Sequence, residues 1–442
     1  MARPRRIAIR EELLKLFPAR VLRALAREHG AVARLRKVDP VKLFWSLVLG
    51  FGGGRERTIS GLRRAYEKAT RQTIEESSFY DRFSPGLVKM LRAAAGRALA
   101  GCAQVGRTLQ GPLAAFRDVV MTDGSVMRLH DLLSRVYPGC RTNHSKAALK
   151  LHAVISVLGA GQQSIKLTEG KRHDGPVFTV GPWVAERLLL FDLGYFRYQL
   201  FDCITRNGGY FVSRLKANAD PIIVAVHRAY RGRAVPLVGR KLREVLPRLR
   251  RGVLDVTVEV SFPRRRYGGR IHKATQRLRV IGVLDERSGE YHLYVTNVST
   301  QKLTAEDIQS VYAARWEVEL LFKELKSHYR MEDLPSSKRE VVEALVYSAI
   351  LTLLCGRRLL NLLRQKQKLL ADRLPQQRWA VVFSEVARDI LLLLVRPRRE
   401  EVAAERQVSE FILHEAVDPN RDRPSLLHAV ETRRHAYRRK AA

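Results

Sequence analysis

The sequence predicts an α/β protein that has helices before its sheet, a β-rich insertion within it and helices after it. Apolar residues recur at helical spacing up to about residue 110. From about 116, short apolar runs that end in Gly or Asp alternate with helix-like segments, as in layered α/β folds. After 217 the apolar and polar residues alternate strictly, which is typical of antiparallel sheet.

The charge of the chain indicates an anionic partner. Its 442 residues include 80 Lys and Arg against 44 Asp and Glu, which gives a net charge of +36. A protein with this charge repels itself unless an anion neutralises it, and nucleic acid is the usual partner. Membrane surfaces and ribosomal RNA are the competing anions, and the charge says nothing about catalysis.

Cysteines and apolar runs indicate a cytoplasmic protein with no membrane partner. The four cysteines form no CxxC pair, so neither a zinc finger nor a disulfide framework is expected; they are Cys102, Cys140, Cys203 and Cys355. The basic N-terminus lacks the apolar core of a signal peptide. The apolar runs 47–54 and 344–356 are shorter than the ~20 residues of a membrane span.

Residues 1–112 are expected to be helical. The segments EELLKLFPARVLRALAREHG and VKLFWSLVLGF have apolar residues at helical spacing. Ser77 and Ser78 offer an N-cap before Phe79. Two helices and a tight turn in this basic region permit a helix-turn-helix, although ordinary packing of helices explains the pattern equally well.

Residues 113–216 are expected to form the first part of the sheet domain. Asp123 ends the apolar run in VVMTDGS, and Asp192 ends the run in LLLFDLGYF. In open α/β sheets, ligands bind at the carboxyl ends of the strands. An Asp-Gly after a strand is nevertheless more often a simple turn.

The remaining chain divides into an insertion, a second part of the core and a tail. Residues 217–300 are expected to form a β-rich insertion that includes VLDVTVEVSF and a basic loop, PRRRYGGR. Residues 301–400 should complete the core and add C-terminal helices. Residues 401–442 are expected to be a basic polar tail, of which RRHAYRRKAA is mobile.

The segment 312–326, YAARWEVELLFKELK, carries three glutamates in unequal positions. At ~100° per residue, one stripe of the helix holds Tyr312, Arg315, Glu319 and Lys326. Another stripe is apolar and is expected to face the core; it holds Ala314, Val318, Leu321 and Leu325. Glu317 and Glu324 lie outside both stripes and are expected to face solvent. An ordinary surface helix with an Arg315–Glu319 ion pair explains the same pattern.

Three carboxylates can bind metal ions together if the fold brings them close to one another. Asp123, Asp192 and Glu319 together would hold two Mg²⁺ or Mn²⁺ ions, which prefer oxygen ligands. Two such ions ~4 Å apart activate a water or a 3′-hydroxyl and stabilise the leaving oxygen of a phosphodiester. The other acids are less convincing, because they fall within strand, helix or loop patterns; these are Asp118, Asp131, Asp174 and Asp202.

These residues resemble a known family. The stripe fits the Y-(2)-R-(3)-E-(6)-K signature of DDE transposases of the insertion-sequence-four type, and TDGS and LLLFDLGYF resemble the two catalytic-aspartate regions of that family. The similarity runs from about 118 to 335. It implies an RNase H-like core with an insertion, in which Asp123, Asp192 and Glu319 are the catalytic, metal-binding triad.

The resemblance also implies partners. Tyr312, Arg315 and Lys326 would hold phosphates of double-stranded DNA, at the transposon ends and at the target, with Arg214 and Lys216 as further basic residues. A homodimer in the end-bound complex is expected, as is an N-terminal region that recognises the ends. Well-studied members stack a flipped base on a tryptophan of the insertion, but residues 217–300 contain none. Tyr267 or Phe262 would substitute, or the hairpin step differs.

The predicted function is therefore metal-dependent cleavage and strand transfer at insertion-sequence ends, in the nucleoid of the bacterial cytoplasm. One alternative is an RNase H-like DNA nuclease without transfer activity. Another is a DNA-binding transposase descendant that is catalytically inactive. A tyrosine recombinase is disfavoured, because no tyrosine follows the His-x-x-Arg pattern at 435–438.

Overall fold

The structure is a computed structural model, which describes most of the chain. The described residues are 7–32, 38–54, 57–101, 108–140, 145–158, 163–228, 236–249, 251–267, 270–332, 334, 336–367, 373–418 and 426–433. Cys102, the side chain of Tyr267, residues 268–269 and the segment 434–442, with its His-x-x-Arg pattern, lie outside them.

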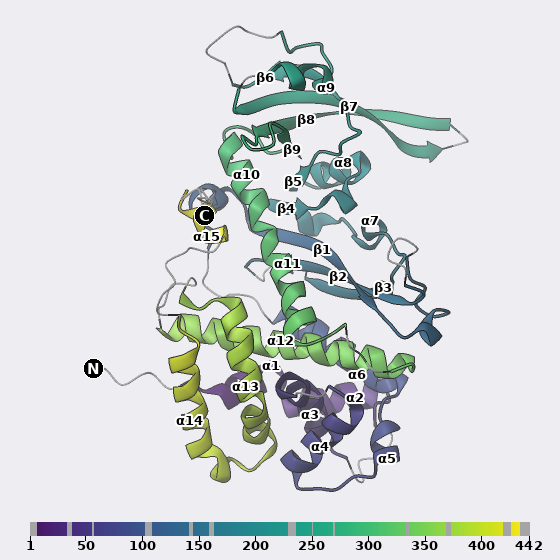
Figure 1. The fold of residues 1–442 in the computed structure, drawn as a ribbon, viewed down its shortest axis with the longest axis vertical. Helices are drawn as coiled ribbons and strands as arrows, with labels where there is room; N and C mark the ends of the chain where they lie inside the picture. Colours follow the sequence, from purple (N-terminus) through teal and green to yellow (C-terminus); the bar gives the residue numbers. More distant parts are fainter. Residues whose placement is uncertain are drawn as a thin grey trace.

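Helices from both ends of the chain form one helical body, which lies below the sheet in Figure 1. The N-terminal helices are α1 (Ile9–Leu16), α2 (Ala19–Glu28), α3 (Pro40–Gly53), α4 (Ile59–Thr70), α5 (Glu76–Tyr80) and α6 (Pro85–Ala100). The C-terminal helices are α12 (Arg339–Gln367), α13 (Gln376–Val395) and α14 (Arg398–Glu415). Helix α13 packs on α3, and α12 packs on α3 and α6, so the two ends share one core.

Local sequence explains where two of these helices begin. Asp39 accepts a hydrogen bond from the backbone N–H of Val41 at the start of α3, and Ser84 accepts one from Leu87 at the start of α6. In both helices the cap is followed by proline at the first helical position, where no backbone N–H is needed. The prediction of a cap at Ser77 or Ser78 is wrong, because both lie inside α5, which follows Glu75.

Helix α12 is a core helix. Among the described residues it alone is long and apolar enough, over Arg339–Gln365, to cross a membrane by length and composition. However, 78% of its most apolar stretch is buried inside the protein. Burial between α3, α6 and α13 accounts for its apolar character.

The sheet contains nine strands in the order β3-β2-β1-β4-β5-β9-β8-β7-β6. The first five in this order are β3 (Ser164–Glu169), β2 (Ala148–Ser156), β1 (Asp118–Arg128), β4 (Arg187–Phe191) and β5 (Tyr210–Arg214). Strands β1, β4 and β5 are parallel, whereas the other pairings are antiparallel. The described fold is thus mixed α/β, as the sequence predicts.

The segment 217–300, expected to be β-rich, extends this sheet. Its strands are β6 (Ile222–Val226), β7 (Val253–Tyr267), β8 (Arg270–Leu284) and β9 (Tyr291–Thr296), with the short helix α9 (Leu242–Val245). Strand β9 pairs with β5, which makes the sheet continuous. The alternating residues Val256, Val258 and Val260 are buried on one face of β7, as expected. A buried ion pair between Asp255 and Arg279, 2.6 Å long, joins β7 to β8.

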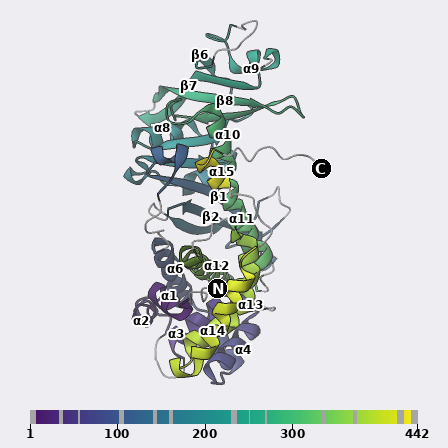
Figure 2. The ribbon, with the colours of Figure 1, turned by 90° about the vertical axis from the view of Figure 1, so that its left-hand side faces the viewer.

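Both faces of the sheet are covered. Helices α7 (Asp174–Val177) and α8 (Tyr198–Arg206) lie on one side, and α10 (Ala305–Ala314) and α11 (Trp316–Lys323) cross the other (Figures 1 and 2). The expectation of a polar tail from 401 is wrong for the described residues. Residues up to Glu415 belong to α14, and α15 (Leu426–Glu431) packs against α10.

Candidate active site

Two predicted acids lie just past the parallel pairing of neighbouring strands, Asp123 within β1 and Asp192 directly after β4. Strands β1 and β4 are in register with Thr122 opposite Phe191, so Asp123 and Asp192 each come one residue later. Side chains of a strand alternate between its faces. Because Met121 and Leu190 face the core beneath α10–α12, Asp123 and Asp192 are directed to that same face. The parallel pairing thus brings the two aspartates side by side at its carboxyl end, in the interior of the sheet.

The third acid comes from the helix that crosses this face. Helix α11 contacts β1, and it carries Glu319. Arg315, at the junction of α10 and α11, donates a hydrogen bond from Nη2 to Glu319 Oε1 at 2.6 Å. Its Nη1 lies 3.6 Å from Asp123 Oδ2. One guanidinium therefore joins the acid of β1 to the acid of α11.

The three acids share one electrostatic environment. Burial raises the pKa of Asp123 to about 6, and the charges of Asp192 and Glu319 also raise it. The backbone N–H of Gly124, 2.8 Å from Asp123 Oδ1, and the charge of Arg315 act in the opposite direction. The negative charges of the three acids are thus concentrated in one place, and the Gly124 N–H and Arg315 only partly compensate them.

The donor set suits a hard divalent cation, although the described residues do not form a closed metal site. Carboxylate oxygens are the ligands that Mg²⁺ and Mn²⁺ prefer. Within the described residues, no three His, Cys, Asp or Glu side chains lie close enough together to hold a metal ion. The positively charged guanidinium of Arg315 lies between Asp123 and Glu319, and it pairs with both of these acids in place of a metal ion.

Tyr312 and Arg214 border the acids, whereas Lys216 packs elsewhere. The Tyr312 ring packs on Tyr294, with ring centres 5.2 Å apart, and the Arg315 guanidinium lies 5.5 Å from its ring centre. Arg214 ends β5, which neighbours β4, and its Nη2 lies 3.2 Å from His292 Nδ1. The Lys216 ammonium lies 5.6 Å from the centre of the Phe196 ring, which belongs to the core of the opposite face.

A π-helical turn at Glu324–His328 separates Lys326 from the other members of the predicted stripe. A π turn has more residues than an α turn, so it changes the direction of the side chains that follow. Lys326 donates to the backbone oxygen of Val126 at 3.0 Å and lies 2.8 Å from Glu332. The expectation of one continuous stripe therefore holds only as far as Glu319.

The prediction that Glu324 and Glu317 face solvent is wrong. Glu324 is 3% exposed and forms a 2.5 Å ion pair with Arg357 of α12; burial raises its pKa. Glu317 is half-buried and accepts a hydrogen bond from the backbone N–H of Leu427, at the start of α15, at 3.3 Å. Both contacts come from C-terminal helices, whose position the sequence did not reveal.

Three of the acids set aside in the sequence have separate structural partners. Asp118 is buried, where it accepts hydrogen bonds from the Ser156 hydroxyl and from the backbone N–H of Leu158. Asp202 pairs with the guanidinium of Arg264 through two hydrogen bonds of 3.0 Å. Asp131 is exposed and lies 3.5 Å from Lys146.

Asp174 is the acid that sequence reasoning undervalued. It begins α7 and lies next to Gly124 and Gly194, which closely follow Asp123 and Asp192. Lys150 and His152, two residues apart in β2, contact it. The signal available in the sequence was the pair Lys150 and His152, two basic residues that alternate along one apolar strand and can both contact an acid.

Phe262 does not provide the aromatic surface that was expected of it. It is 4% exposed, and its ring stacks on Tyr198 of α8 with ring centres 6.1 Å apart. This prediction is wrong for Phe262, because alternation in β7 directs the ring into the core.

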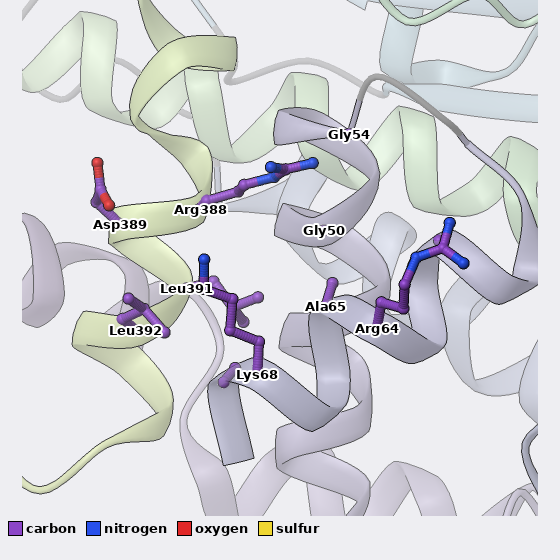
Figure 3. Close-up of a pocket in the computed structure, with 11 residues that line it drawn as sticks. Gly50, Gly54, Arg64, Ala65, Lys68, Arg388, Asp389, Leu391 and Leu392 are labelled. Atoms are coloured by element: carbon purple, nitrogen blue, oxygen red, sulfur yellow. The ribbon is translucent and has the colours of Figure 1, made fainter. Parts of the chain in front are cut away.

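A cavity of about 460 Å³ lies in the helical body, between α3, α4 and α13. Figure 3 shows that Arg64 and Lys68 of α4 and Arg388 of α13 surround it, with Asp389 at one side. The glycines Gly50 and Gly54 form its wall on α3. The cavity is separate from the acids, and its basic side chains suit an anion.

The sequence of this chain is similar to those of known proteins. The family model described as transposase DDE domain matches residues 114–355. The chain is 22% identical to the transposase for insertion sequence element IS231E of Bacillus thuringiensis subsp. finitimus, over 57% of this chain and 59% of that relative. It is 21% identical to the transposase for IS231C of Bacillus thuringiensis subsp. berliner, over 81% of each chain. The transposase for IS1151 of Clostridium perfringens is 22% identical over 54% of this chain and 56% of its own length.

Proposed function

Because the chain belongs to the DDE transposases, of the insertion-sequence-four type, we propose that it cuts DNA at insertion-sequence ends and transfers the ends to target DNA. The observation that carries the proposal is the meeting of Asp123 and Glu319 on one guanidinium, beside Asp192. Acids 196 residues apart in the chain converge there at the edge of the parallel strands.

The proposed core is RNase H-like. The strand order β3-β2-β1-β4-β5 supports this proposal, with β1, β4 and β5 parallel and β2 and β3 antiparallel. Residues 113–216 and 301–400 would form the two parts of that core, and 217–300 would be the insertion. The pairing of β5 with β9 explains how an insertion is accommodated without opening the sheet.

Asp123, Asp192 and Glu319 are the proposed ligands of two Mg²⁺ or Mn²⁺ ions. The chemistry that such ions supply is activation of water or a 3′-hydroxyl and stabilisation of the leaving oxygen of a phosphodiester. Asp123 must be ionised to act as a ligand, which its pKa of about 6 permits at neutral pH. Glu319 must release the guanidinium of Arg315, which then becomes available for a DNA phosphate.

The proposed partner is double-stranded DNA, both at the transposon ends and at the target. A homodimer would bind this DNA in the bacterial cytoplasm, at the nucleoid. The net charge of +36 supports an anionic partner of this size. Tyr312, Arg315, Lys326 and Arg214 lie on or next to the strands and helices that carry the acids, where they would contact phosphates. Lys216, which packs against Phe196, would contact DNA farther from the acids.

The N-terminal part of the helical body, residues 1–112, is the proposed end-binding region. The cavity between α3, α4 and α13 is lined by the cationic side chains of Arg64, Lys68 and Arg388, together with the acid Asp389. A phosphate in such a hollow would be bound through charge-assisted hydrogen bonds.

The test compares nicking of end-containing DNA by the wild type and by Glu319→Gln, Glu317→Gln and Glu324→Gln proteins in Mg²⁺. We expect Glu319→Gln to abolish nicking, while Glu317→Gln, whose amide oxygen can still accept the hydrogen bond from Leu427, retains it. Glu324→Gln is assayed after its folding is verified, since Glu324 is a buried partner of Arg357. Full activity of Glu319→Gln would overturn the assignment.

Products of the same assay separate the alternatives. Joined products with target DNA identify a transposase, whereas nicks without joining identify a nuclease. Binding to correct ends with no nicking by the wild type would identify an inactive DNA-binding descendant.

A further inference from the structure

The carboxylate of Asp174 touches the chain just after each of the two aspartates. A methyl group added to Gly124, the residue after Asp123, would lie 2.3 Å from Asp174 Oδ1. A methyl group added to Gly194, two residues after Asp192, would lie 3.5 Å from Asp174 Oδ2. One side chain from α7 therefore packs against Gly124 and lies close to Gly194, in the two segments that carry the aspartates.

Two basic residues of β2 hold this carboxylate in place. Lys150 Nζ lies 2.7 Å from Asp174 Oδ2, and His152 Nδ1 lies 3.0 Å from Oδ1. His152 Nε2 lies 2.8 Å from the Thr168 hydroxyl of β3, and Lys150 Nζ also donates to the backbone oxygen of Arg172 at 3.3 Å. The Asp174 side chain is 18% exposed and that of His152 is 5% exposed, so the network is largely shielded from water.

The network lies on the face of the sheet opposite to the acids. Gly124 is directly opposite His152 in the β1–β2 pairing, and opposed residues share a face. Asp123 precedes Gly124 and is directed to the other face. Asp174 is therefore placed behind the aspartates, not among their oxygens.

We propose that Asp174, held by Lys150 and His152, is a positioning residue that fixes the separation of the Asp123 and Asp192 carboxylates. The inference rests on the proposed function, in which both aspartates bind the same cations. Two carboxylates repel each other, and here Asp123 lies within β1, just past the end of its pairing with β4, while Asp192 directly follows β4. A carboxylate packed behind both segments limits how far they move toward that face of the sheet, and so restricts the positions of the two aspartates.

Gly124 is a required part of this arrangement. At 2.3 Å a β-carbon there would force Asp174 away from its position. Only glycine lets the carboxylate approach the backbone of β1 closely. Gly194, at 3.5 Å, leaves ordinary van der Waals contact.

A network that serves stability alone is the competing explanation, and a matched control distinguishes it. Asp202 lies in α8, which packs against the same face of the sheet, and is held by Arg264 and Arg206, but it contacts neither Gly124 nor Gly194. Asp202→Ala thus removes a comparable charge network at a distance from the aspartates.

The experiment uses the full chain and measures three quantities for wild type, Asp174→Ala, Gly124→Ala and Asp202→Ala. They are Mn²⁺ affinity by electron paramagnetic resonance without DNA, the Mg²⁺ concentration for half-maximal nicking, and Tm. Positioning residues behind metal ligands typically change metal affinity by 10–100-fold. We expect Asp174→Ala and Gly124→Ala to weaken Mn²⁺ binding about tenfold and to raise the Mg²⁺ requirement equally. Asp202→Ala should lower Tm without either effect.

Two outcomes overturn the inference, and one overturns the proposed function instead. Unchanged Mn²⁺ affinity in Asp174→Ala, with Tm lowered as in Asp202→Ala, assigns the network to stability. If Asp174→Ala does not fold, the Gly124→Ala protein provides the test. A Gly124→Ala protein that binds Mn²⁺ as tightly as the wild type overturns the inference. Mn²⁺ binding that is absent in the wild type, or unchanged in Asp123→Asn, overturns the metal assignment of the proposed function itself.

Discussion

Replacement of Asp123 by asparagine should stabilise the metal-free protein at neutral pH. Burial and the charges of Asp192 and Glu319 place the pKa of Asp123 at about 6, against a reference value of 3.8. The folded protein therefore favours the neutral acid, and ionisation of Asp123 costs folding free energy. Asparagine resembles the neutral acid in shape, and its side-chain oxygen still accepts the hydrogen bond from Gly124.

The size and sign of the effect follow from the pKa difference. Each pKa unit corresponds to about 1.4 kcal/mol, so a difference of about two units costs about 3 kcal/mol when Asp123 is fully ionised. Because the folded pKa is above the unfolded one, this cost is absent well below pH 3.8, grows through the interval to pH 6 and is complete above it. The gain from Asp123→Asn should therefore be up to about 3 kcal/mol at pH 7 and about 0.5 kcal/mol at pH 4.

Urea unfolding of both proteins at pH 4 and pH 7, in the presence of chelator, measures the gain. Asp131→Asn is the control, because Asp131 is an exposed surface acid. Added Mg²⁺ should stabilise the wild type and not the Asp123→Asn protein, since a ligand of the folded state adds stability only where it binds. An Asp123→Asn protein that is no more stable than wild type at pH 7, or equally stabilised at both pH values, would refute the reasoning.

Three further outcomes are expected. Arg315→Ala removes the cation beside Asp123, whose charge lowers the pKa of Asp123, so that pKa should rise. The acidic limb of the nicking–pH profile should move to higher pH, and an unchanged limb contradicts the contact. Arg357→Met leaves the carboxylate of Glu324 buried and unpaired, which should lower stability by about 3–5 kcal/mol at pH 7 and by less at pH 4, where the acid is protonated. Chemical unfolding at the two pH values measures this, and equal losses would exclude the charge as the cause. Affinity for end DNA should fall steeply with added salt, as a binding assay in a salt series measures, because basic side chains release counterions on binding phosphates. A flat salt dependence would contradict binding through charge.

The sequence alone predicted the architecture in outline because hydrophobic periodicity is a local property. The change from helical spacing to apolar runs at about 116 marks the first strands, and the alternation at Val256, Val258 and Val260 marks a half-buried strand. Asp123 and Asp192 were selected for a physical reason, since both end apolar runs of the sequence, although β1 continues past Asp123 to Arg128. Their side-by-side placement depended on parallel pairing between strands far apart in the chain, which periodicity does not specify.

Errors arose where partners come from distant segments. Helical geometry directed Glu324 to solvent, but a π turn and Arg357 of α12 place it in the interior. Glu317 likewise meets α15, more than a hundred residues later. The tail expected from 401 contains α14 and α15, because its polar composition concealed one apolar side on each helix.

The sequence by itself determined the fold class, the basic character and the spacing that sets Glu319 apart from Glu317 and Glu324, since these follow from composition and local periodicity. Tertiary structure decided that Arg315 connects Asp123 to Glu319, that Lys326 turns toward β1 and that Asp174 lies behind both aspartates. These contacts join residues from separate strands and helices. Their existence depends on packing of the whole sheet against its helices, which no local pattern encodes.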